Sequence, residues 1–256
     1  MTEESPTIPA APHETRGRLR RAADWARRMA ARLRVGGRLF VYQSRLALSR
    51  QTVFLVVALC IFLSAVVARS RISSPPECLQ VLQAFLCAVF ILLCMGLVTH
   101  DRDKGLFEMT LVSSPGFHQL ILMKFGPAAF WAFALGAAAA GALYWLVGGF
   151  PLAIGFFFAY TTGLLAGMTT LSLSVFTRSA YAAAAATALA AFGIYHYYEA
   201  DQHVAVLDPF LQVFSERLDR GSLSLFCWNR FYTLALTGLL YDQTVRRMRR
   251  IELWVK

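Results

Sequence analysis

Residues 125–147 read FGPAAFWAFALGAAAAGALYWLV, and this run contains no Asp, Glu, Lys or Arg. A helix rises 1.5 Å per residue, so about 20 such residues cross the ~30 Å hydrocarbon core of a bilayer. A helix on the surface of a soluble protein would instead carry polar residues every few positions. Four other runs are equally free of charge: Thr52–Ala68, Leu79–Val98, Leu152–Val175 and Ala180–Tyr198. The sequence therefore predicts an all-α polytopic membrane protein with five clear spans.

A sixth span is predicted at about residues 225–241. Asn229 and Arg230 lie near one end of it, and the run is uncharged only from Phe231 onward. Arg230 can extend its guanidinium group to the interface if it lies within a turn or two of the membrane surface, so this charge does not exclude a span. We therefore expect six transmembrane helices.

The charge distribution predicts the orientation. The chain is 57% hydrophobic and 16% charged, with a net charge of +10 and a mean hydropathy of +0.51. With the N-terminus inside, 20 of its 25 Lys and Arg residues fall on the cytoplasmic side, as the positive-inside rule requires. This predicts an N-in/C-in topology and assigns the positive charge to anionic lipid headgroups, not to nucleic acid. No cleavable signal peptide is visible, so the first span is expected to direct insertion.

The N-terminal residues form two regions before the first span. Residues 1–15 contain three prolines and no periodicity, which predicts a disordered tail. Within residues 16–50, apolar residues and Trp25 occupy one side of a helical wheel while arginines such as Arg20 and Arg27 occupy the other. This pattern favours an amphipathic helix at the inner interface, with a partner-binding helix as the alternative. Gly36-Gly37 separates it from a second short helix, and residues 51–256 form the transmembrane domain.

The segment between the fifth and sixth spans, Glu199–Ser224, is predicted to lie outside. It carries five acidic residues and two arginines but interleaves them with many apolar side chains. Such a segment is too apolar for a solvated loop, so we expect short amphipathic helices at the outer interface. Phe210 and Phe214 are its candidate contacts for an extracytoplasmic partner.

Neither the cysteines nor the aromatic residues form a recognisable metal or cofactor site. The five cysteines show no CxxC spacing, and the pairing of Cys78 with Cys227 near the outer surface stays open. Residues 195–198 read YHYY, which is typical of an aromatic belt, with a ligand or haem site as the alternative. We expect no metal in this chain.

The sequence lacks the residues that several functional classes need. The predicted spans contain no ionisable group except Arg230 and His196 near their ends, which disfavours a carrier driven by an ion gradient. No GxxxxGK[ST] motif is present, so ATP would be used by another polypeptide. No Ser/His/Asp set, HExxH motif or paired carboxylates lies in a span, so we expect no catalytic residues.

The stretch 99–115, THDRDKGLFEMTLVSSP, is the polar connection between the second and third spans. Gly105 allows the backbone to turn out of the span, and Ser114-Pro115 ends the short helix that follows. Phe107, Met109, Leu111 and Val112 supply an apolar stripe beside the charges. A charged helix with an apolar stripe suits the groove of a partner protein, with an ordinary solvated loop as the alternative.

This stretch resembles the cytoplasmic coupling loop of ABC-2 type transporter permeases. The resemblance rests on residues 101–108, on 111–115 and on Lys124 at the start of the next span, although Leu106 stands where the family usually has Thr. Residues 173–181, LSVFTRSAY, are similar to the family's short basic turn between spans four and five. Residues 214–254 resemble the C-terminal part of the NosY and gliding-motility permeases, so the likeness covers about 38–256.

The resemblance implies a non-catalytic permease subunit of an ABC exporter in the bacterial inner membrane. Separate P-loop ATPase subunits would bind ATP and Mg, and a second permease subunit, identical or different, would complete the transporter. The residues implied to couple to the ATPase are Asp101, Arg102, Gly105, Glu108, Ser113 and Ser114. The alternative is a scaffold subunit that relays ATP-driven motion to an extracytoplasmic partner through Phe210 and Phe214. Gly163 and Gly167, and the run Ala182–Ala186, are expected to let helices pack closely.

Overall fold

The computed structural model describes residues 41–42, 44–45, 48–70, 74–99, 116–147, 152–200 and 220–250. The chain divides into two compact units, residues 1–42 and residues 43–256. Of the first unit only Val41 and Tyr42 are described, and both are helical. The predictions for the disordered tail and the Arg-rich amphipathic helix therefore fall outside the described residues.

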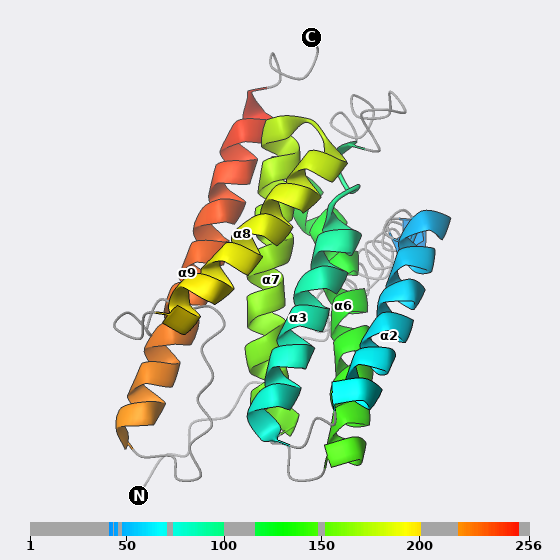
Figure 1. Ribbon diagram of the computed structural model, residues 1–256. Helices are drawn as coiled ribbons and strands as arrows, with labels where there is room; N and C mark the ends of the chain where they lie inside the picture. Colours follow the sequence, from blue (N-terminus) through cyan, green and yellow to red (C-terminus); the bar gives the residue numbers. More distant parts are fainter. Residues whose placement is uncertain are drawn as a thin grey trace, which may run out of the picture. The chain divides into compact units, whose positions relative to one another are not determined.

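Six helices make up the second unit over its described ranges, and none of these residues forms a strand. They are α2 (Arg50–Ser70), α3 (Pro75–Cys94), α6 (Phe117–Val147), α7 (Leu152–Thr177), α8 (Ala180–Ala200) and α9 (Arg220–Arg249). Consecutive helices run in alternating directions, as Figure 1 shows. α2, α6 and α8 therefore run one way, and α3, α7 and α9 run the other way. The predicted all-α fold is confirmed for the described part of the chain.

Local sequence explains where several helices begin and end. α3 begins with Pro75 and Pro76, whose missing N–H groups are not needed in a first turn. The backbone N–H of Ser74 donates to the Glu77 carboxylate at 3.4 Å, which caps the N-terminus of the helix. Between α7 and α8 only Arg178 and Ser179 intervene, with Arg178 in the left-handed region at φ 59°. The fourth and fifth predicted spans are therefore joined by a short turn, within the stretch 173–181 that resembles such a turn in the permease family.

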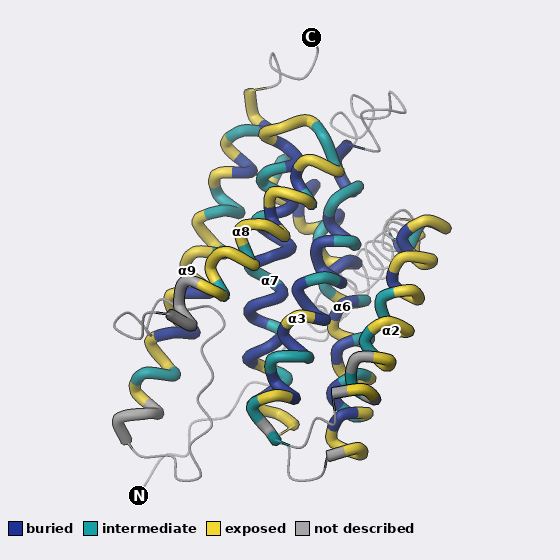
Figure 2. Tube along the Cα trace, in the orientation of Figure 1, coloured by how far each residue is buried: buried dark blue, intermediate teal, exposed yellow. Residues whose placement is uncertain are grey.

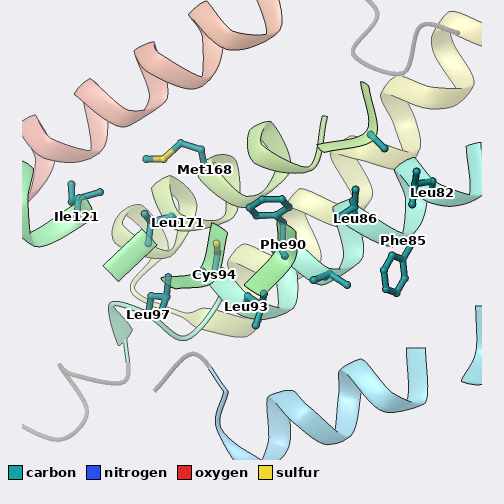
Figure 3. Close-up of a cluster of buried hydrophobic side chains, with 14 of the residues drawn as sticks. Leu82, Phe85, Leu86, Phe90, Leu93, Cys94, Leu97, Ile121, Met168 and Leu171 are labelled. Atoms are coloured by element: carbon teal, nitrogen blue, oxygen red, sulfur yellow. The ribbon is translucent and has the colours of Figure 1, made fainter. Parts of the chain in front are cut away.

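α3 and α7 lie at the centre of the packing. α3 contacts α2, α6, α7 and α8, while α7 contacts α3, α6, α8 and α9. Figure 2 shows the buried residues concentrated on these two helices, whereas α2 and α8 present long exposed faces. The largest fully buried apolar side chains come mainly from α3 and α7, together with Ile121 and Met248: Phe90, Phe158, Leu79, Leu82, Leu86, Leu93, Met168 and Leu171. Figure 3 shows Phe90 in this cluster.

Gly163 and Gly167 explain how α3 and α7 approach so closely. A Cβ atom at Gly163 would lie 2.6 Å from a ring carbon of Phe90, and one at Gly167 would lie 2.7 Å from another. The Phe90 ring therefore occupies the space that two missing side chains leave, one helical turn apart. The close packing predicted from the Gly-xxx-Gly spacing is confirmed, and it operates within this chain between α3 and α7.

Three described helices are long and apolar enough to cross a membrane: Pro76–Cys94 of α3, Phe117–Leu146 of α6 and Leu152–Thr177, which is all of α7. Arg50–Ala65 of α2 and Ala180–His196 of α8 are apolar but shorter. α9 has 30 residues, but it carries Arg230 in its first half and Arg246, Arg247 and Arg249 in its last turn. A membrane protein is thus supported by three helices, and the remaining spans stay predictions.

Candidate functional site

The predicted coupling residues lie in the connection between α3 and α6. Asp101, Arg102, Gly105, Glu108, Ser113 and Ser114 all fall outside the described residues, as do Phe210 and Phe214 in the connection between α8 and α9. The structure does describe both ends of the α3–α6 connection, Thr99 and Gly116. These ends and the helices around them form the candidate site, and we call them the coupling end of the bundle.

On the α3 side, the chain reaches the connection through buried turns. The helix ends at Cys94, and the Leu97 N–H donates to the Cys94 carbonyl at 3.4 Å, which forms a tight turn after the helix. Leu97, Val98 and Thr99 are all buried. Motion of residues 100–115 would therefore act directly on packed residues.

Lys124 links this turn to α6, the helix that carries it. Its ammonium group donates to the Leu97 carbonyl at 2.8 Å, and the side chain is only 1% exposed. A hydrogen bond from an ionised donor is stronger than a neutral one, especially where water is excluded. Leu97 lies three residues beyond the end of α3, so the bond ties the turn that follows α3 to α6.

The first turn of α6 is held by α9. Tyr241 donates its hydroxyl hydrogen to the His118 carbonyl at 3.1 Å, and its oxygen lies 3.3 Å from His118 Nδ1. Arg249 Nη2 lies 3.2 Å from His118 Nε2. Because a guanidinium can only donate, Nε2 must accept, which assigns the proton of a neutral imidazole to Nδ1. Nδ1–H then donates to the Tyr241 oxygen, so every contact has a donor and an acceptor.

The C-terminal half of α9 also packs against α7 at this end. The Arg247 guanidinium lies 4.9 Å from the centre of the Phe176 ring, and Val245 and Met248 are buried. Asp242 and Arg246 form an exposed ion pair at 2.7 Å one helical turn apart. α3, α6, α7 and α9 are therefore linked to one another beside the connection that carries the predicted coupling residues.

Arg230 of α9 is buried within the bundle. The residue is 3% exposed, and its side chain packs against α7. Its Nη1 atom donates to Thr161 Oγ1 at 2.9 Å, to Thr162 Oγ1 at 3.2 Å and to the Phe158 carbonyl at 3.2 Å. Phe158 lies six residues after Leu152, about 9 Å inside the end of α7. The cation thus lies well within the length of a predicted span.

The surroundings of Arg230 are suited to a buried cation. Its guanidinium carbon lies 4.3 Å from the centre of the Phe158 ring, which places the charge over an electron-rich face. Thr161 and Thr162 each donate to the Phe158 carbonyl at 3.0 Å, so their oxygen lone pairs are available to accept from the arginine. A guanidinium stays protonated in proteins, so this network holds a fixed charge and offers no proton relay.

The remaining candidates gain no chemistry from the structure. Cys78 is buried and Cys227 is exposed, and both are free thiols. His196 contacts the rings of Phe192 and Tyr195 on α8. Among the described residues no group of three or more His, Cys, Asp or Glu side chains could hold a metal ion.

Comparisons with known proteins do not extend this picture. No protein-family model matches the chain, and neither a curated protein nor a solved structure matches it.

Sequence reasoning missed the links at the coupling end. The pattern placed Lys124 at the boundary of a span but gave no sign that it is buried against Leu97. Tyr241 and His118 are 123 residues apart, so only the antiparallel packing of α6 and α9 brings them together. One signal was present: polar residues recur on α9 beyond its apolar stretch, at Asp242, Arg246 and Arg249, which indicates that the helix continues past the predicted span.

Proposed function

We propose that this chain is the membrane-spanning permease subunit of an ABC-2 type exporter. It would cross the membrane six times with both termini in the cytoplasm, and a separate P-loop ATPase would dock on residues 100–115. ATP and Mg would bind in that partner, and a second permease subunit would complete the pathway.

The observation that carries the proposal is the arrangement at the coupling end. Force applied to residues 100–115 would enter α3 through the buried Leu97 turn and α6 through its first turns. Lys124 links α3 to α6, and Tyr241 and Arg249 link α6 to α9. Such a set of links would move several helices together, which is what an externally driven permease needs.

The buried Arg230 favours this reading over an ion-driven carrier. Its guanidinium cannot release its proton. A gradient-driven carrier needs groups that change their protonation or coordinate an ion during the cycle.

Purification with a tagged chain tests the proposal. We expect a P-loop ATPase to co-purify, and its ATP turnover to rise when the permease is present in liposomes. Glu108→Lys should weaken this complex or abolish the stimulation, because charge reversal within a docked contact costs more than at a free surface.

Asp242→Lys is the matched control, since it reverses an acidic charge at the coupling end outside the connection, on an exposed helical position. An exposed ion pair contributes little to stability, so this variant should bind and stimulate normally. Normal binding and stimulation by Glu108→Lys would refute the docking assignment. Solute uptake down an ion gradient by the permease without any ATPase would refute the proposed function itself.

A further inference from the structure

A cavity of about 450 Å³ lies between α2, α3 and α6. Leu63 and Val67 line it from α2, Val81 and Phe85 from α3, and Ala138 and Ala142 from α6. Figure 3 shows Phe85 on the side of α3 that faces α2. The volume falls within the range of sites that bind small molecules in proteins, about 300–1,000 Å³.

The lining offers little to a polar ligand. Ser64 is its one hydroxyl side chain; that hydroxyl donates to the Cys60 carbonyl at 2.8 Å and keeps only its acceptor lone pairs. The remaining lining residues are aliphatic or aromatic apart from the Cys60 thiol. Water needs two to four polar partners to occupy a cavity, so an apolar occupant is favoured here.

The position of the cavity matches one leaflet of a bilayer. Along α6 its lining runs over the twelve residues from Leu135 to Leu146, a rise of about 16 Å. Half of a ~30 Å hydrocarbon core is about 15 Å. The lining residues of α6 lie in its C-terminal half, those of α2 lie from its middle to its C-terminal end, and those of α3 lie in its first half or at its middle. All three sets therefore belong to the end of the bundle opposite the coupling end.

The same end carries groups that suit a lipid headgroup region. Arg69 is exposed in the last turn of α2, two residues after the lining residue Val67, so it lies at the end of the helix beyond the cavity but on a different face from the lining residues. Its guanidinium matches the geometry of a phosphate. Trp145, next to the lining residue Leu146, is 90% exposed, and Trp is enriched at the boundary between the hydrocarbon core and the headgroups.

We propose that this cavity binds one acyl chain of a membrane phospholipid, with the lipid phosphate beside Arg69. The site would hold a lipid at a fixed place between α2 and the α3–α6 pair. The inference rests on the membrane location of these helices and does not require an ATPase partner.

The test is photo-cross-linking in vesicles of phosphatidylethanolamine and phosphatidylglycerol that contain a phospholipid with a diazirine on one acyl chain. We expect adducts on the peptides that hold residues 60–67 and 135–146. Ala138 is exposed and lines the cavity, so Ala138→Phe fills it without displacing core residues. Overfilling a site by this amount should reduce labelling about tenfold, equivalent to ~1.4 kcal/mol.

Ala137→Phe is the matched control, because Ala137 is exposed on the same helix but does not line the cavity. It should leave labelling unchanged. Ala142→Phe, at a second exposed lining position, should repeat the loss, and unchanged unfolding temperatures would show that all three variants fold.

Two results would overturn the inference. Labelling spread evenly over the exposed residues of α2 and unaffected by Ala138→Phe would mean contact with bulk lipid only. Absence of lipid adducts together with cross-linking of two copies through Cys60 would mean that a second copy occupies the cavity. Neither result would alter ATPase binding at residues 100–115, so failure here is distinct from failure of the proposed function.

Discussion

At the residue scale, Phe90 depends on two glycines. Gly163→Ala would place its new Cβ 2.6 Å from the Phe90 ring and 3.3 Å from the backbone of Leu86. The other edge of the ring faces Gly167, where an added Cβ would lie 2.7 Å away, so the ring already fits closely between the two glycines. Overpacking of this kind costs about 1–3 kcal/mol. We expect Gly163→Ala to lower the unfolding temperature in detergent by several degrees.

Gly193→Ala is the control, since nothing lies within 4 Å of a Cβ at that position. It should be neutral or slightly stabilising, because alanine favours helix over glycine by up to about 1 kcal/mol. Phe90→Leu should cancel part of the penalty of Gly163→Ala in a double-mutant cycle. Equal unfolding temperatures for the two alanine variants would contradict the packing described here.

A second prediction at this scale concerns the contacts of Arg230. Replacing Thr161 and Thr162 together with Val removes two acceptors from a buried guanidinium. Each hydrogen bond to a charged group is worth about 1.5–3 kcal/mol, so the loss should be large. Arg230→Met should cost less, because both threonine hydroxyls keep their backbone acceptor.

Unfolding temperatures of the two variants and of the triple variant check this order. The triple variant should resemble Arg230→Met more closely than it resembles the double valine variant. A larger loss from Arg230→Met than from the two valines would show that other contacts of the arginine dominate.

Individual residues were predictable to different degrees. The Gly163–Gly167 spacing indicated close packing, because the absence of side chains is visible in sequence. The partner, Phe90, was not visible, since it depends on which face of α3 meets α7. A lone charge beside an apolar run commonly extends to the interface, so the sequence alone gives no sign that Arg230 is buried. Its burial depends on acceptors supplied by another helix.

At the element scale, the third prediction concerns the link from α6 to α3. Lys124→Met removes the donor to the Leu97 carbonyl while keeping an apolar side chain of similar length. Loss of a charge-assisted hydrogen bond worth at least ~1.4 kcal/mol should speed local opening about tenfold. Hydrogen exchange should therefore accelerate in residues 95–99, at the end of α3.

Arg246→Met is the matched control. The Arg246 side chain is 76% exposed and pairs with Asp242 one helical turn away on the same helix. This variant should leave exchange in residues 95–99 unchanged. Unaltered exchange in Lys124→Met would show that the α3–α6 link does not hold this turn.

The helix boundaries show where the apolar pattern alone was sufficient to predict the ends of a helix. The predicted starts of the fourth and fifth spans, Leu152 and Ala180, coincide with α7 and α8. α6 begins at Phe117, eight residues before the predicted Phe125, because the buried Lys124 has its charge satisfied within the bundle. α9 extends to Arg249, past the predicted Tyr241, because a helix can continue into water beyond its apolar stretch.

At the scale of the whole molecule, the described helices support a membrane protein. Four of these helices are linked to one another at the coupling end. Three helices are long and apolar enough to span a bilayer, and α3, α6, α7 and α9 are joined beside the α3–α6 connection. The candidate coupling residues themselves stay predictions, since they fall outside the described residues. Their chemistry could be argued from sequence because it lies in one continuous segment, unlike the links at His118 and Lys124.

The most direct test of the proposed function places a photo-cross-linker on the predicted docking stripe. We would replace Phe107 with benzoylphenylalanine in the full chain and irradiate the membranes of cells that produce it. We expect an adduct with a P-loop ATPase from position 107 and none from the same probe at Phe210, which should lie on the opposite side of the membrane. No ATPase adduct at position 107, or an ATPase adduct only at position 210, would contradict the proposal.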